Sequence, residues 1–215
     1  MATKGVFGGI FDPLLPPQTP KNLVTGAVNA FYVTNMVHDV LYQYGFTELA
    51  GNYQKNNFDK GGKGEDSVII NVQNSERENS AYFDTFPDGQ SGVIDLHIYT
   101  TTNPNRDPAL DNTVMIHELT HGLSSRLTGG AQTKLLYWNL VEAYGFSANL
   151  HDATQEKGNI IFLQLLVGTL MIQPCNPTFD SAYDAMLAAD DAYYGGIHKH
   201  LIRKGFAKRG LDPVS

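Results

Sequence analysis

The chain has 215 residues, 42% of them hydrophobic and 11% aromatic, so it can bury one substantial core or two small ones and is not intrinsically disordered. Its formal net charge of −7 argues against nucleic acid as the main partner, because a phosphate-binding surface needs clustered Lys and Arg. The single cysteine excludes an intrachain disulfide. The N-terminus has no apolar core of signal-peptide length, and the longest apolar stretch, residues 160–172, is too short to span a bilayer, so no membrane contact is expected.

Hydrophobic periodicity divides the chain into a strand-containing first part and a helical second part. Residues 1–23, rich in Pro and Gly, are expected to form an irregular lead-in, followed by an N-terminal α+β part over 24–130 and a C-terminal helical part over 131–215. Helical spacing of apolar residues predicts helices over about 24–44, 111–127, 133–144, 159–172, 178–193 and 197–208. Strand patterns cover about 67–72, 80–83 and 93–99. Strands that precede helices indicate an α+β fold with a mixed or antiparallel sheet.

The segment His117-Glu118-Leu119-Thr120-His121 carries the chemistry of this chain, because it reads H-E-x-x-H within a predicted helix. Two histidines four residues apart lie about one turn from each other on one helix face, so both can bind one zinc ion. Glu118 can then act as the base for a zinc-bound water. A surface helix with two chance histidines is the alternative. The cap before the helix and the glycine pair after it favour the zinc site, and the expected buried residues of the helix are Met115, Ile116, Leu119 and Leu123.

The residues after the motif narrow the class of zinc site. A third histidine three residues after a glycine would mark a metzincin, but those two positions hold Ser124 and Leu127. The remaining common arrangement takes a glutamate from a following helix, as in thermolysin.

Several stretches together resemble the fungalysin family of secreted fungal metallopeptidases, which are relatives of thermolysin. They occur in family order and cover most of the chain: FYVTNMVHDVLYQYGF (31–46), NYQKNNFDKGGKGEDSV (52–68), FPDGQSG (86–92), NPNRDPALDNTVMIHELTHGLSSRLTGG (103–130), QPCNPTF (173–179) and GFAKRGL (205–211).

This resemblance implies a thermolysin-like zincin fold and a zinc-dependent endopeptidase that hydrolyses peptide bonds in extracellular proteins. It assigns His117 and His121 as zinc ligands and Glu118 as the catalytic glutamate. Ser80 and Ala81 begin the strand that would bind an extended polypeptide substrate, with Ser80 replacing a family asparagine. Secretion as a zymogen with an N-terminal propeptide is implied as well, and a monomer is expected.

The chain departs from the family after the zinc helix. It lacks the G-E-G-W-S-D segment that supplies the glutamate ligand and the later histidine segment, and about a hundred residues are missing against typical domain sizes. Glu142 follows His121 by 21 residues and is the candidate third ligand, although Phe146 stands where the class places an orienting aspartate. An exposed helix acid is the other interpretation of Glu142. A shortened, inactive relative that binds zinc or peptide weakly is therefore the alternative function.

Two further expectations concern the C-terminal part. Fungalysins pair the cysteine of QPCNP with one near the C-terminal helix, where this chain has His200, so Cys175 is expected to be a buried free thiol. His198 and His200 are expected to lie on the surface rather than to form a metal site.

Overall fold

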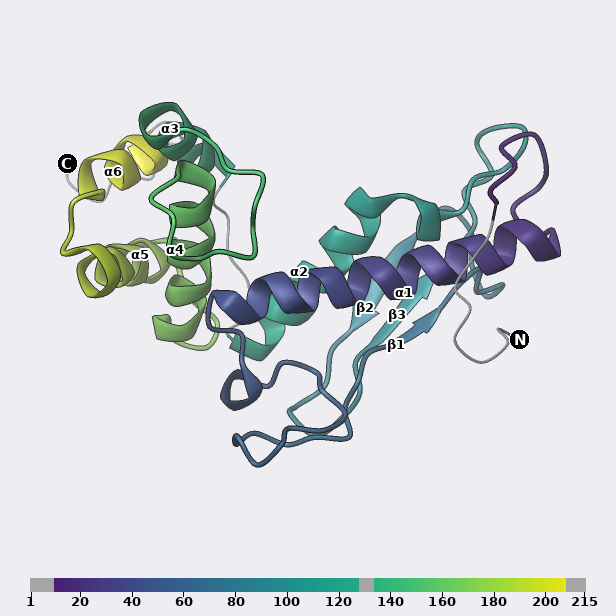
Figure 1. Ribbon diagram of the computed structural model, residues 1–215, viewed down its shortest axis with the longest axis horizontal. Helices are drawn as coiled ribbons and strands as arrows, with labels where there is room; N and C mark the ends of the chain where they lie inside the picture. The colour runs from purple at the N-terminus through teal and green to yellow at the C-terminus, as the bar shows by residue number, and fades with distance from the viewer. Residues whose placement is uncertain (1–9, 128–133, 208–215) are drawn as a thin grey trace. The chain divides into compact units, whose positions relative to one another are not determined.

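The computed structural model describes residues 10–127 and 134–207 (Figure 1). The chain divides into two compact units, one formed by residues 1–38 and 53–123 and the other by residues 39–52 and 124–215. We call them the sheet unit and the helical unit. The division of the chain at residues 24 and 131 stays a prediction.

The first half of the described chain forms two long helices, two short 3-10 turns and three strands: α1 (Pro20–Gln43), η1 (Glu48–Ala50), β1 (Ile69–Asn71), β2 (Ala81–Asp84), β3 (Val93–Leu96), η2 (Pro108–Leu110) and α2 (Asn112–Leu127). The strands form one sheet in the order β1-β3-β2, in which β1 runs parallel and β2 antiparallel to β3. The predicted mixed sheet is therefore confirmed. The first helix begins earlier than predicted, at Pro20, because proline suits the first helical position.

One face of the sheet carries the core of the sheet unit. Ile94 and Leu96 alternate along β3 and so project to the same face, where they pack with Ala30 and Val33 of α1 and Met115 of α2. Figure 1 shows α1 lying across the strands. Helices α1 and α2 thus cover one face of the sheet, and this packing holds the zinc helix predicted from the sequence.

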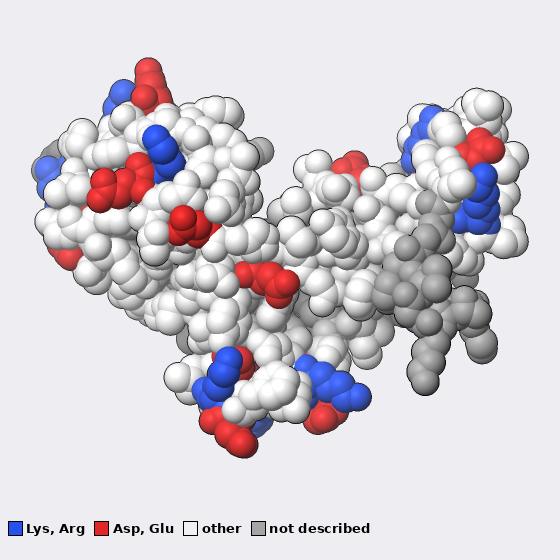
Figure 2. Space-filling model, in the orientation of Figure 1, with Lys and Arg blue, Asp and Glu red and all other residues white. Residues whose placement is uncertain are grey.

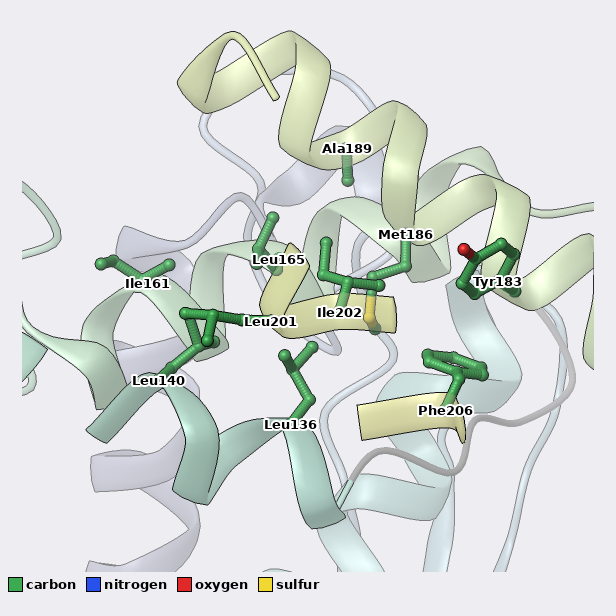
Figure 3. Packing of buried hydrophobic residues seen from close by; sticks show 10 residues of the cluster. All are labelled: Leu136, Leu140, Ile161, Leu165, Tyr183, Met186, Ala189, Leu201, Ile202 and Phe206. Carbon is green, nitrogen blue, oxygen red and sulfur yellow. The ribbon is translucent and has the colours of Figure 1, made fainter. Parts of the chain in front are cut away.

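The helical unit contains α3 (Lys134–Tyr144), α4 (Gly158–Ile172), α5 (Phe179–Tyr194) and α6 (Lys199–Ala207), each within two residues of its predicted bounds. All four helices contribute to one apolar core (Figure 3), formed by Leu136, Leu140, Ile161, Leu165, Tyr183, Met186, Ala189, Leu201, Ile202 and Phe206. Together with the sheet unit they confirm the α+β class. No helix among the described residues combines the length and the apolar character needed to cross a bilayer.

His198 is buried, so the prediction that it lies on the surface was wrong. Its Nδ1 lies 2.7 Å from Oδ1 of Asp190, and its main-chain N–H donates to Oδ2 of the same carboxylate at 2.9 Å. Both side chains are at most 1% exposed. The turn at Gly195 and Gly196, both at positive φ, reverses the chain after α5 and brings the start of α6 back onto Asp190.

Cys175 carries an exposed thiol, which corrects the expectation of a buried one. It lies between Pro174 and Pro177 in the connection from α4 to α5, and connections of this kind run over the surface. Figure 2 shows acidic and basic side chains in small mixed groups with wide uncharged areas between them.

Candidate metal centre

The two histidines of the H-E-x-x-H motif converge on one point beside α2. Both are exposed, their Nε2 atoms lie 3.0 Å apart, and their ring centroids are 4.7 Å apart at an interplanar angle of 84°. Two nitrogens bound to one tetrahedral zinc at about 2.0–2.1 Å lie about 3.3 Å from each other. The observed spacing of His117 and His121 therefore fits the zinc ion that the motif predicts.

Glu118, which follows His117 in the motif, is buried, with 4% of its surface exposed. Its Oε2 atom has no hydrogen-bond partner among the described residues, which is unusual for a buried carboxylate. Burial raises the pKa of Glu118, while His117 and His121 act in the opposite direction. A carboxylate with a raised pKa beside two imidazoles is suited to accept a proton.

The position of α2 on the sheet depends on close contact between Gly122 and the ring of Phe83. A Cβ atom at Gly122, the residue after His121, would lie within 3.0 Å of three ring atoms of Phe83. Gly92 approaches the same ring, and Tyr53 packs against it edge-on with centroids 5.7 Å apart. The hydroxyl of Tyr53 also donates to the Gly122 carbonyl at 3.3 Å. Glycine is therefore needed at position 122 to bring the helix onto the sheet at the turn that carries His121.

The buried side of α2 differs from the predicted one. Met115, Glu118, Gly122 and Leu123 are buried, whereas Ile116 is 47% exposed. Ile116 lies about 100° around the helix from Met115, which turns it toward the histidine side. The prediction that Ile116 is buried was wrong. The buried side of α2 includes Glu118 in place of Ile116.

Tyr99 is a site residue that the sequence did not single out. Burial raises the pKa of its phenol, and the neighbouring charges of Asp111 and then Glu118 raise it further. Two main-chain hydrogen bonds of 2.9 Å to Arg106 hold this segment in place after β3. The regular alternation of the strand gave no sign that the charge of Glu118 acts on this side chain.

Strand β2 lies at the edge of the sheet that the described residues form. Ser80 O accepts a hydrogen bond from His97 N at 3.0 Å, so the main chain of Ser80 is turned toward β3. Because paired and unpaired positions alternate in an antiparallel ladder, the N–H and C=O of Ala81 point to the open edge. The hydroxyl of Ser80 is buried.

The described residues contain no group of three or more His, Cys, Asp or Glu side chains that could hold a metal ion. Glu142 is exposed on α3, in the helical unit, while His117 and His121 belong to the sheet unit. Its role as third ligand stays a prediction.

Comparisons with known proteins identify relatives over most of the chain. The family model described as Fungalysin metallopeptidase (M36) matches residues 4–136 and 134–213. Extracellular metalloproteinase 3 of Trichophyton soudanense is 32% identical over 285 residues, which cover 91% of this chain and 72% of that protein. Extracellular metalloproteinase MEP of Pyricularia oryzae is 32% identical over 297 residues, which cover 96% of this chain and 46% of that protein.

The same comparisons locate the segment that this chain lacks. Since 91% of 215 residues is about 196, about 89 of the 285 positions aligned with the Trichophyton protein fall opposite gaps in this chain. The two matches to the family model meet at residues 134–136. The internal shortening predicted from the sequence is therefore confirmed, and it falls after α2, where the two matches meet in the first turn of α3.

Proposed function

Since this chain belongs to the fungalysin metallopeptidase family, we propose that it is a zinc-dependent endopeptidase that cuts extended polypeptides outside the cell. The arrangement of α2 carries the proposal. Two imidazole nitrogens 3.0 Å apart face one point, and the adjacent buried carboxylate of Glu118 keeps one oxygen without a hydrogen-bond partner among the described residues. Buried carboxylate oxygens usually have a hydrogen-bond partner, so this oxygen is available to accept a proton.

The chemistry assigns one role to each of these side chains. His117 and His121 hold zinc through Nε2, and bound zinc supplies Lewis acidity toward water and the substrate carbonyl. Glu118 accepts the proton that water loses as its oxygen attacks the carbonyl carbon. It then gives this proton to the leaving amine nitrogen as the C–N bond breaks. Burial of the Glu118 carboxylate favours the first transfer, because it raises the proton affinity of the group.

Strand β2 supplies the surface for the substrate backbone. The main-chain groups of Ala81 point to the open edge of the sheet, so an extended peptide can pair there as an added strand. Ser80 contributes less, because its carbonyl is bound to His97 and its hydroxyl is buried. We assign the main-chain contact to Ala81.

Glu142 is the residue that we assign as third ligand, and the catalytic form is a monomer. Its carboxylate is exposed on α3, where a metal ion can reach it. Secretion agrees with the names of the relatives, which describe extracellular enzymes.

Zinc analysis and casein cleavage by the purified full chain test this function. One zinc per chain and zinc-dependent cleavage are expected, and Glu118→Gln should retain zinc but lose cleavage by at least about 100-fold. Glu142→Ala should weaken zinc binding at least about tenfold. Asp184→Ala, which removes an exposed helix carboxylate from α5, is the matched control and should change neither. A folded chain that leaves casein uncut with zinc in excess would show that the shortened relative is inactive.

A further inference from the structure

The connection from β1 to β2 has to pass the end of β3, because β3 lies between these two strands in the sheet. It bonds to the main chain on both sides of His97. The N–H of Asn74 donates to the Leu96 carbonyl at 2.8 Å. The N–H of Asn79 donates to the Ile98 carbonyl at 2.9 Å. His97 therefore lies where the connection passes the end of β3.

The side chain of His97 is fully buried, although it projects from the face of the sheet opposite to that of Leu96, which packs in the core. Its Nδ1 lies 3.0 Å from the carbonyl oxygen of Asn74, and because a carbonyl can only accept, this nitrogen carries the proton. The ring stacks on that of Tyr82 in β2, with centroids 5.5 Å apart at an interplanar angle of 29°. The main-chain N–H of His97 donates to the Ser80 carbonyl at 3.0 Å. One residue thus contacts the start of the connection, its end and β2 itself.

Two buried polar atoms at this point complement each other. Nε2 of His97 is the unprotonated nitrogen and can only accept, whereas the hydroxyl of Ser80 can donate. Neither atom has a hydrogen-bond partner among the described residues. Because Ala81 pairs with Leu96, Ser80 stands opposite His97 and their side chains share one face of the sheet. Histidine at this position therefore offers a donor to the connection and an acceptor on the side of β2.

A network of side-chain amides joins His97 to the centre of the sheet. The buried carboxylate of Asp95 accepts through Oδ1 from Asn71 on β1 and from Asn74 in the connection. Asn74 thus binds Asp95 through its side chain and His97 through its carbonyl. Strands β1 and β3 fix the position of His97 in this way, and β2 packs against it.

We propose that His97 is a positioning residue for the peptidase reaction, because it holds β2 where the main chain of Ala81 pairs with the substrate. This inference rests on the proposed function, in which an extended peptide adds to the edge at β2. His97 contacts Ser80 and Tyr82, the two neighbours of Ala81. In the sheet that the described residues form, β2 has a partner strand on one side only. A displaced β2 would weaken substrate binding and leave the chemistry of Glu118 unchanged.

Two substitutions separate the contributions of the His97 ring. His97→Phe keeps an aromatic ring for Tyr82 and removes both nitrogens. His97→Asn places an amide N–H close to the position of Nδ1, so it can still donate to the Asn74 carbonyl. Asn22→Ala is the matched control, because Asn22 is equally buried in the same unit and donates to the Asp12 carbonyl at 2.9 Å, outside the sheet.

Peptide binding and casein cleavage measure the effect on the substrate. Binding is followed by fluorescence anisotropy of a fluorescein-labelled casein peptide, with zinc-loaded Glu118→Gln chain as the background. We expect His97→Phe to raise the dissociation constant and the KM for casein at least about fivefold, with kcat changed less than about twofold. His97→Asn should show a smaller rise, and Asn22→Ala should change neither constant.

Amide hydrogen exchange of the full chain provides a measurement that needs no activity. The amides of Tyr82 and Asp84 alternate with that of Ala81 and so pair with β3, and local opening of β2 exposes them. His97→Phe should speed their exchange at least about fivefold relative to the buried Met115 in α2. Asn22→Ala should leave this ratio unchanged.

The outcomes separate this inference from the proposed function. Unchanged binding and KM in His97→Phe, or an equal rise in Asn22→Ala, overturn the positioning role while the peptidase stands. If the zinc-loaded chain neither binds nor cuts casein, the proposed function fails and the exchange rates decide whether His97 holds β2. Faster exchange of the β2 amides in His97→Phe alone then supports this role, and unchanged exchange overturns it.

Discussion

Replacing Gly122 by alanine tests how the zinc helix is seated on the sheet. The alanine Cβ would lie within 3.0 Å of three ring atoms of Phe83, which is closer than Cβ atoms normally approach other atoms. Gly92 also lies close to this ring, so the ring has little room to move away. The substitution changes no metal ligand and no charge. It therefore isolates the packing that positions His121 and Glu118.

Two opposing effects set the size of the change in unfolding free energy. Alanine in a helix interior is favoured over glycine by about 1 kcal/mol. Overpacking a well-filled core costs about 1–3 kcal/mol. We therefore expect Gly122→Ala to destabilise the chain by up to about 2 kcal/mol. In the Phe83→Leu background the ring is gone, and the same change should stabilise by about 0.5–1 kcal/mol.

Urea unfolding followed by far-UV circular dichroism measures all four members of this double-mutant cycle. Gly205→Ala in α6 is the matched control, because its Cβ would meet Leu136 at an ordinary 3.4 Å and should stabilise by about 0.5–1 kcal/mol. If Gly122→Ala stabilises the wild-type chain as much as this control, the close contact with Phe83 does not constrain the helix.

Three other predictions concern stability. Burial raises the pKa of Asp107 above its unfolded value, so the folded chain loses stability as the pH rises from the unfolded pKa to the folded pKa. Asp107→Asn should reduce this loss of stability in unfolding measured between about pH 4 and 6. Burial, and to a lesser extent the charge of Asp190, raises the pKa of Tyr194 to about 12. Stability should therefore fall as the pH rises above the unfolded tyrosine pKa of about 10. Tyr194→Phe should show a smaller fall in alkaline unfolding curves. Leu165→Ala in the four-helix core should cost about 2–5 kcal/mol in urea unfolding, and a cost under about 1 kcal/mol would contradict the packing in Figure 3.

The sequence predicted the elements well because their signals are local. Helical spacing of apolar residues located α3 to α6 within two residues, and the same signal located α2 at Asn112–Leu127. The strand predicted over 93–99 is shorter, since its ladder ends at Leu96, and a single bridge from Tyr99 to Arg106 follows. Patterns of alternation mark extended backbone but do not show where a partner strand ends.

The errors fall where burial depends on residues far apart in the chain. The sequence pattern predicts His198 as an exposed polar residue at the start of a helix. The carboxylate of Asp190 on the previous helix instead contacts both the ring Nδ1 and the main-chain N–H of His198. Because these polar groups have partners, the His198 side chain can be buried. Cys175 reads as a core thiol, but it lies in an exposed connection between two prolines. Neither outcome follows from spacing along the chain.

The H-E-x-x-H motif and its flanking stretches identified the family by themselves, and they predict two imidazole ligands, because residues four apart on a helix must share a face. Only the tertiary structure decided that Glu118 is buried with an unsatisfied oxygen, that Ile116 faces outward beside His117, and that Phe83 requires glycine at position 122. These properties arise from contacts between α2 and the sheet. The helical pattern in the sequence gives the angular position of each side chain around the helix axis. Whether a side chain at that position is buried depends on the elements packed against the helix.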